Sequence, residues 1–136
     1  MRSRGSGWGL AALVVGVAYV VIGRAFALPG LDGRAWRLAA WAVSGALFAA
    51  HLGYEHVRLG SRSRTAAVHA ALAAAIGAFG LAVAGMLHTR STGAAIGPTW
   101  LLALVLWPLI TAVPAFLVAL VLGLLLRRLP RGAGAG

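Results

Sequence analysis

WLLALVLWPLITAVPAFLVALVLGLLL, residues 100–126, is the stretch that decides the fold. It carries no charged residue, and it exceeds the roughly 20 residues that a helix needs to cross the hydrocarbon core of a bilayer. Its apolar positions are continuous, whereas a strand of a membrane barrel alternates apolar and polar residues. The stretch therefore predicts a transmembrane helix.

Two prolines interrupt this predicted helix. Pro108 and Pro114 each lack a backbone donor, which frees the carbonyl four residues earlier, at Leu104 and Ile110. The hydroxyl of Thr111 is expected to satisfy one of these carbonyls. We therefore predict a kink or tilt at the prolines.

Three further apolar stretches precede this one, and short polar links join them. Short links between long helices favour antiparallel neighbours. The sequence therefore predicts an all-α fold, an integral membrane four-helix up-down bundle that forms a single domain of residues 1–136. The predicted helices cover residues 8–28, 35–57, 66–87 and 100–126, with short polar tails at 1–7 and 127–136.

The composition also indicates a membrane protein. The chain is 61% hydrophobic and 10% charged, with a mean hydropathy of +0.91. A soluble domain is about 25% charged, and a small one exposes too much of its area to hide this much apolar surface. Membrane lipids are therefore the expected surroundings.

The net charge of +10 comes entirely from arginines that flank the apolar runs. A basic face for nucleic acid is absent from this pattern, so no nucleic-acid partner is expected. Cytoplasmic segments are enriched in basic residues. With the N-terminus inside, eight of the twelve arginines are cytoplasmic, which predicts cytoplasmic termini in a bacterial inner membrane. The inner set is Arg2, Arg4, Arg58, Arg62, Arg64, Arg127, Arg128 and Arg131, and the outer set is Arg24, Arg34, Arg37 and Arg90.

The N-terminus permits a second interpretation. Basic residues, an apolar run and Ala25-Phe26-Ala27 resemble a signal peptide with its cleavage site. Arg24 lies unfavourably beside that site. Cleavage would leave three helices.

The second predicted helix carries a polar seam. Arg37, Ser44, His51 and Arg58 recur at intervals that keep them on one side of the helix, and Glu55 follows His51 by one turn. Because charge in hydrocarbon costs several kcal/mol, the seam should face protein or water.

The stretch AHLGYEHVR, residues 50–58, is the candidate functional site. Counted from a turn at residue 62, Glu55 and His69 should lie at equal depth, with His51 roughly 6 Å deeper. These three side chains and Arg58 form a candidate proton relay or polar cluster. The favoured interpretation, however, is structural: Glu55 pairs with Arg58 or reaches the headgroups near the membrane surface.

Metal and haem sites have little support. His51 and His56 are separated by about 140° around a helix, so they cannot share one ion as the histidines of zinc proteases do. His51, Glu55 and His69 remain a weak metal candidate, and His51 with His69 a weak haem candidate. The sequence requires no cofactor.

Small residues define the expected packing surfaces. In membranes they let helix backbones approach closely. The expected packing residues are Gly9, Gly16 and Gly23 in the first helix and Ala73, Gly77, Gly80 and Ala84 in the third.

The chain shows no catalytic residue set, so an enzyme is not expected. The primary expectation is an accessory, assembly or stabilising subunit that packs against other transmembrane subunits or itself. The alternative is a small homo-oligomeric transporter or channel with a proton-linked inner gate of histidine and glutamate.

Overall fold

The computed structural model describes residues 7–28, 30 and 33–128, and this part of the chain is all-helical without strands. Four helices follow in order: α1 (Gly7–Ala25), α2 (Arg34–Val57), α3 (Ser63–Ser91) and α4 (Pro98–Arg128). The prediction of an all-α fold with four helices is confirmed.

The helix ends differ from the predicted ones by up to four residues. α3 continues through polar residues on both sides, to Ser63 and Ser91, because its backbone bonding does not stop where the apolar run stops. α1 instead ends at Ala25, before residue 28. Pro29 disfavours helical geometry in the residue that precedes it, which accounts for the early end.

Three of the described helices are long and apolar enough to cross a membrane: α1, α3 and the Pro98–Leu126 part of α4. This supports a membrane protein. α2 does not meet the same criterion, although the sequence predicted four spanning helices. Its charged and polar residues, which include Arg34, Arg37, His51 and Glu55, lower its mean hydropathy.

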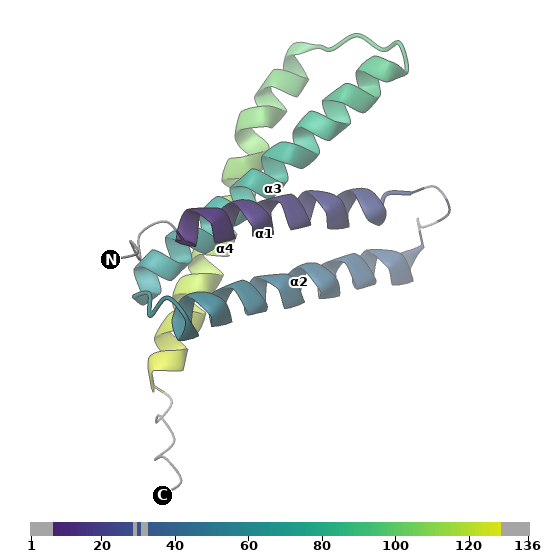
Figure 1. The fold of residues 1–136 in the computed structure, drawn as a ribbon. Coiled ribbons are helices and arrows are strands. Elements are labelled where there is room, and N and C mark those ends of the chain that lie inside the picture. Colours follow the sequence, from purple (N-terminus) through teal and green to yellow (C-terminus); the bar gives the residue numbers. More distant parts are fainter. Residues whose placement is uncertain (1–6, 29, 31–32, 129–136) are drawn as a thin grey trace, which may run out of the picture.

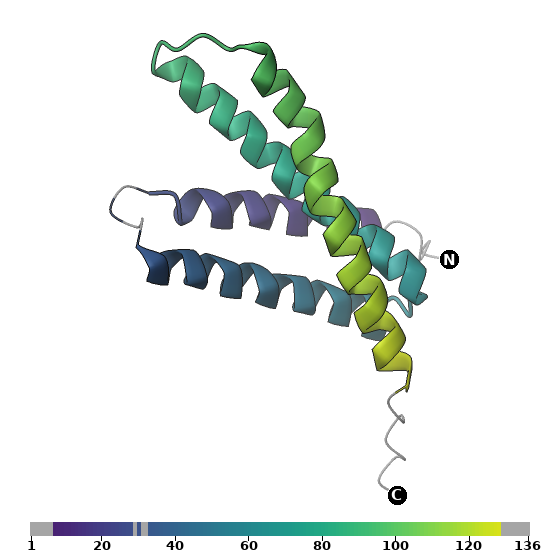
Figure 2. The ribbon, with the colours of Figure 1, turned by 180° about the vertical axis from the view of Figure 1, so that it is seen from behind.

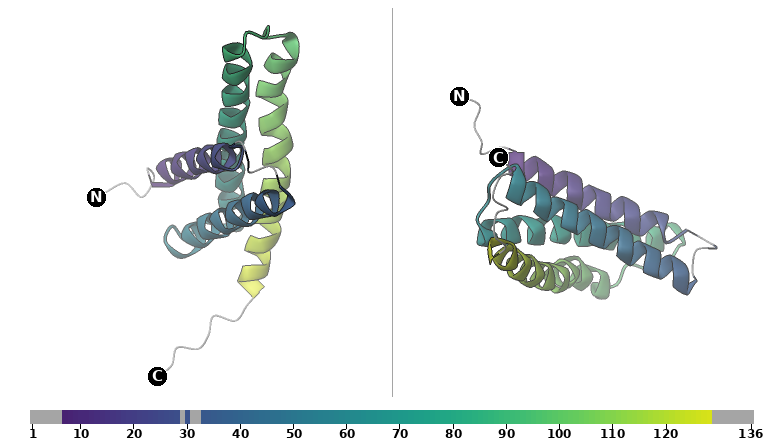
Figure 3. Two further views of the ribbon diagram at one scale, coloured as in Figure 1. Left: turned by 90° about the vertical axis from the view of Figure 1, so that its right-hand side faces the viewer. Right: turned by 90° about the horizontal axis from the view of Figure 1, so that it is seen from below.

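The helices form two hairpins, α1–α2 and α3–α4, which cross rather than lie along one common axis (Figures 1 and 2). The two views of Figure 3 show the same crossing from the side and from below. α3 is the central helix, because it packs extensively against both α4 and α1, whereas α2 makes fewer contacts with the other helices.

Close backbone approach joins α1 to α3. A Cβ added at Gly77 would lie 2.6 Å from Tyr19 Cβ and 3.3 Å from the Gly16 carbonyl oxygen. A Cβ at Gly16 would lie 2.7 Å from Ile76 Cβ. Only glycine fits these positions without moving a helix, and this absence of side chains is what lets α1 and α3 pack so closely.

The α1–α3 interface continues toward the end of α1, where a Cβ at Gly23 would meet the Leu81 side chain and one at Gly80 would meet Val20. Gly9 differs, because nothing lies within 4 Å of its added Cβ. Gly9 is therefore not one of the close-packing positions of this interface. Ala73 is buried and Ala84 half-buried on α3.

A small apolar core joins α2, α3 and α4 near the end that holds residues 58–62. Alanines of α3 pack there against larger side chains of α2 and α4. Its buried members are Leu52, Ala66, Ala67, Ala70 and Ala119, with Phe48, Phe116 and Leu120 packed on them. This core holds the C-terminal half of α2 beside the start of α3.

α4 runs through both prolines as one helix from Pro98 to Arg128. The hydroxyl of Thr111 donates to the carbonyl of Trp107, in its own preceding turn. The prediction that Thr111 satisfies the carbonyl of Leu104 or Ile110 is therefore wrong. A threonine in a helix reaches most easily the carbonyl four residues before it.

Candidate functional site

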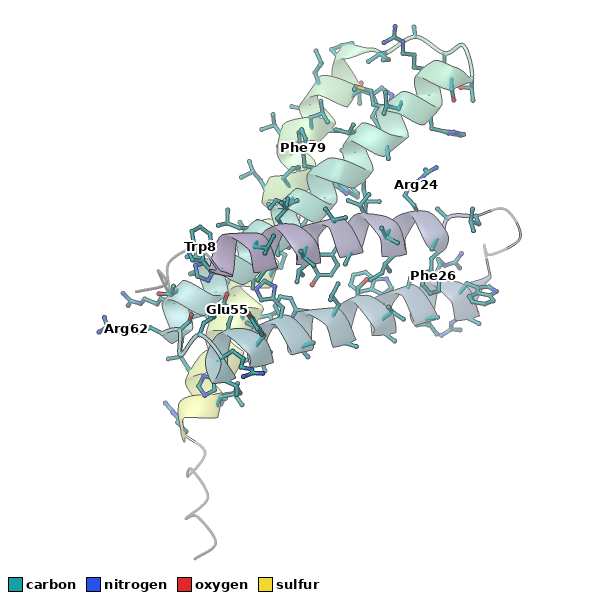
Figure 4. All side chains as sticks on the ribbon, in the orientation of Figure 1. Trp8, Arg24, Phe26, Glu55, Arg62 and Phe79 are labelled. Carbon is teal, nitrogen blue, oxygen red and sulfur yellow. The ribbon has the colours of Figure 1, made fainter. Side chains whose placement is uncertain are left out.

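The candidate site is built around Glu55, which is fully buried at 0% exposure. No other side chain of its size is so completely enclosed among the described residues. A buried carboxylate is costly unless hydrogen-bonded or paired, so its neighbours decide what it can do. Figure 4 shows Glu55 between α2 and α3, close to Trp8 of α1.

Both carboxylate oxygens of Glu55 have partners. Oε1 lies 2.9 Å from Nδ1 of His69, on α3. Oε2 accepts a 2.6 Å hydrogen bond from the hydroxyl of Ser61. With the carboxylate ionised, His69 Nδ1 carries the proton and donates it. Glu55 therefore ties the end of α2 to the loop after it and to α3.

The loop between α2 and α3 positions Ser61. The Arg58 amide closes α2 by donating to the Tyr54 carbonyl at 2.8 Å, and the Ser61 amide donates to the Glu55 carbonyl at 3.1 Å. Gly60 adopts φ +59°, a left-handed conformation that glycine takes at no steric cost. The sharp reversal at Gly60 returns Ser61 to the carboxylate.

Trp8 covers the other side of His69. The two rings stack with centroids 4.5 Å apart and planes inclined by 5°. Because the stack restrains the imidazole ring, it fixes the direction of Nδ1 toward Glu55. The first turn of α1 therefore also packs against this site.

His51 completes the group. It lies one turn before Glu55 and is 4% exposed. Its Nε2 is 3.7 Å from Glu55 Oε1, outside hydrogen-bonding distance. Within the described chain, neither ring nitrogen has a hydrogen-bond partner. The imidazole of His69 is thus paired with the Glu55 carboxylate, whereas the imidazole of His51 lies close to it and keeps its hydrogen-bonding capacity.

The structure brings together three of the four side chains singled out from the sequence, His51, Glu55 and His69. We call them, with Ser61, the Glu55 cluster. Arg58 is exposed, and the partners of Glu55 are His69 and Ser61. The expected pairing of Glu55 with Arg58 is therefore not the arrangement present.

The geometry argues against metal and haem. No group of three His, Cys, Asp or Glu side chains in the described part of the chain could hold a metal ion. His69 Nδ1, the ring nitrogen nearest the carboxylate, is engaged with Glu55 Oε1 as a hydrogen-bond partner. Both imidazoles also meet the same carboxylate oxygen, whereas axial haem ligands must face each other across the ring.

Ser61 and Trp8 were not predicted as parts of the site. Ser61 lies six residues beyond Glu55, outside α2, so no helical periodicity connects the two. The one available signal was the Gly60-Ser61 pair, whose residue types are typical of a turn. Trp8 gave no signal, because its stacking depends on how α1 crosses α3.

Comparison of the chain with protein-family models, with curated proteins and with solved structures yields no match.

Proposed function

We propose that this protein is a small membrane transporter or channel in which the Glu55 cluster takes up and releases a proton to control the junction between α2 and α3. The observation that carries the proposal is the complete burial of Glu55 against an imidazole. An ionisable side chain inside a membrane protein is a functional candidate, because a purely structural contact is met more cheaply by apolar residues.

The cluster has the parts that proton transfer needs. Imidazole is the side chain that exchanges protons most readily near neutral pH. When His69 has taken up a second proton, transfer of the Nδ1 proton to Glu55 replaces an ion pair with a neutral pair, which weakens the tie between the two hairpins. His51, 3.7 Å from the same oxygen, supplies a second proton acceptor.

Ser61 both donates to the Glu55 carboxylate and lines a small cavity. This cavity of about 10 Å³ is also lined by Ser63 and His56. That volume is close to the minimum that holds one water molecule. A water here would connect the Ser61 hydroxyl, and through it Glu55 Oε2, with the polar end of the fold.

Proton flux into proteoliposomes tests this proposal. The protein is reconstituted with a pH-sensitive dye inside the vesicles, and a pH step is applied outside with valinomycin and potassium to clamp the membrane potential. Flux is expected from the wild type, to be lost in Glu55→Gln and to persist in His88→Gln. His88 is the matched control because it is an exposed histidine of α3 that lies outside both the Glu55 cluster and the cavity beside Ser61. Flux equal to that of empty vesicles, or equal flux in Glu55→Gln, rejects the proposal.

A second candidate function is an accessory or stabilising subunit of a larger membrane complex. The observation in its favour is that only 6% of the apolar stretch of α4 is buried within the chain, at a mean hydropathy of 2.7. Such a surface suits other transmembrane subunits or a second copy as well as lipid. Gentle solubilisation from the native membrane and sizing test it: migration at 13.9 kDa plus detergent excludes a stable partner.

We also propose an up-down topology in a bacterial inner membrane, with both termini cytoplasmic. The arginine distribution supports it. Reporter fusions at both tails test the orientation. Reporters that are active only outside the cytoplasm would reverse the assignment.

A further inference from the structure

An open cleft of about 560 Å³ lies between the two crossed hairpins. All four helices contribute to its walls. Its volume falls within the range of about 300–1,000 Å³ that small-molecule sites occupy. The cleft is separate from the Glu55 cluster, since none of the cluster residues lines it.

The walls combine flat and aromatic surfaces. Small residues such as Ala40, Gly45 and Ala78 keep parts of the wall flat, and Trp41 and Trp107 supply indole rings. The two tryptophans are 79% and 55% exposed, so their faces are available to an occupant. Indole rings stack on planar rings at about 4.5–7 Å between centroids. A slot with these walls favours a flat molecule.

The polar groups of the cleft are few and uncharged. No charged side chain lines it, which excludes an ionic ligand. The hydroxyls of Tyr19 and Ser44 and the indole N–H groups of the two tryptophans are all hydrogen-bond donors. The Thr111 hydroxyl is engaged with the Trp107 carbonyl. Donors of this kind complement carbonyl oxygens on a ligand.

We propose that the cleft binds a membrane-soluble planar carbonyl compound of the quinone class. Its ring packs between the wall of small residues and the indoles, and its oxygens accept hydrogen bonds from Tyr19 and Ser44. Any hydrocarbon tail leaves through the open side into the bilayer. This binding is independent of the proton chemistry at Glu55.

Menadione is the probe that tests the site, because quinones quench tryptophan fluorescence and the absence of cysteine prevents covalent addition to the protein. A cleft-blocking variant follows from the geometry. Gly45 lines the cleft, and nothing lies within 4 Å of a Cβ added there. Gly45→Leu therefore fills the cleft without disturbing the helices. Gly9→Leu is the matched control, since Gly9 is equally unobstructed and lies outside the cleft.

Quenching by menadione in lipid nanodiscs is expected to saturate for the wild type and for Gly9→Leu. The apparent affinity for menadione is expected to be at least about tenfold weaker in Gly45→Leu, a loss equivalent to one unit in log affinity. Methylnaphthalene, the same ring without carbonyls, is expected to compete poorly. Circular dichroism confirms that each variant is folded.

Three results would overturn the proposal. Quenching that rises linearly and equally in all three proteins means that menadione only partitions into the bilayer. Equal competition by methylnaphthalene means that the carbonyl oxygens are not recognised. Saturable quenching by a brominated phospholipid that menadione fails to displace means that an acyl chain occupies the cleft.

Discussion

Replacing Gly77 with alanine is expected to push α1 away from α3. The new Cβ would lie 2.6 Å from Tyr19 Cβ and 3.3 Å from the Gly16 carbonyl oxygen. Both atoms are fixed to the α1 backbone, so no rotamer change relieves the contact. Non-bonded carbon atoms settle about 3.5–4.0 Å apart. The two helices must therefore separate by about 1 Å.

The expected energy follows from two opposing effects. Overpacking costs about 1–3 kcal/mol, while alanine is favoured over glycine within a helix by about 1 kcal/mol. Gly45→Ala carries the second effect alone, because nothing lies within 4 Å of the added Cβ. The difference between the two variants should thus be about 1–3 kcal/mol of packing free energy. Gly23→Ala should fall between them, since its Cβ meets the movable end of Leu81 at 2.7 Å.

The assay is unfolding of each variant by sodium dodecyl sulfate in mixed micelles, followed by helical circular dichroism. The free energies of unfolding are expected to rank Gly45→Ala above Gly23→Ala and Gly77→Ala lowest. If Gly77→Ala and Gly45→Ala unfold at the same detergent fraction, the close approach of α1 to α3 is wrong.

Three further substitutions test other parts of the fold by the same unfolding assay. Glu55→Ala leaves the buried His69 and the half-buried Ser61 without their partner, so it should lower the free energy of unfolding by about 3–5 kcal/mol. Glu55→Gln should lower it by less, because its amide oxygen still accepts a hydrogen bond; equal losses would show that the carboxylate oxygens are not bonded as described. Gly60→Ala forces a side chain into the left-handed conformation at φ +59° and should cost about 1–2 kcal/mol; no loss would mean that the loop adopts another conformation. Pro108→Ala restores a backbone donor inside α4 and should stabilise the protein by up to about 3 kcal/mol, a gain that a broken or irregular helix at this position would not give.

Local patterns predicted the helices well, because a long apolar run without charge has few alternatives in a membrane. Depth along the chain was also predictable. Counting from the turn placed Glu55 and His69 at the same level, and the structure has them 2.9 Å apart. Both inferences depend only on helical rise and on the position of the turn.

Contacts that depend on tertiary geometry were not predictable. Arg58 is one turn from Glu55 along the chain, and that spacing suggested an ion pair. The carboxylate turns instead to His69 and Ser61, which the packing of α3 brings near. The crossing of the two hairpins was missed for a related reason. It depends on which glycine faces which side chain across α1 and α3, and helical periodicity does not specify that pairing.

The first turn of α1 and the last turns of α4 lie at the same end of the molecule, beside the loop of residues 58–62, since Gly7 approaches Leu59 and Gly123 approaches Ser63. In the proposed topology, with both termini cytoplasmic, an in-frame gene duplication would start its second copy on the side where the first one started. Both halves of such a fusion would then keep the same sense in the bilayer. Evolution or protein engineering could thus produce tandem arrays from this chain, whereas an inverted repeat would require one additional spanning helix.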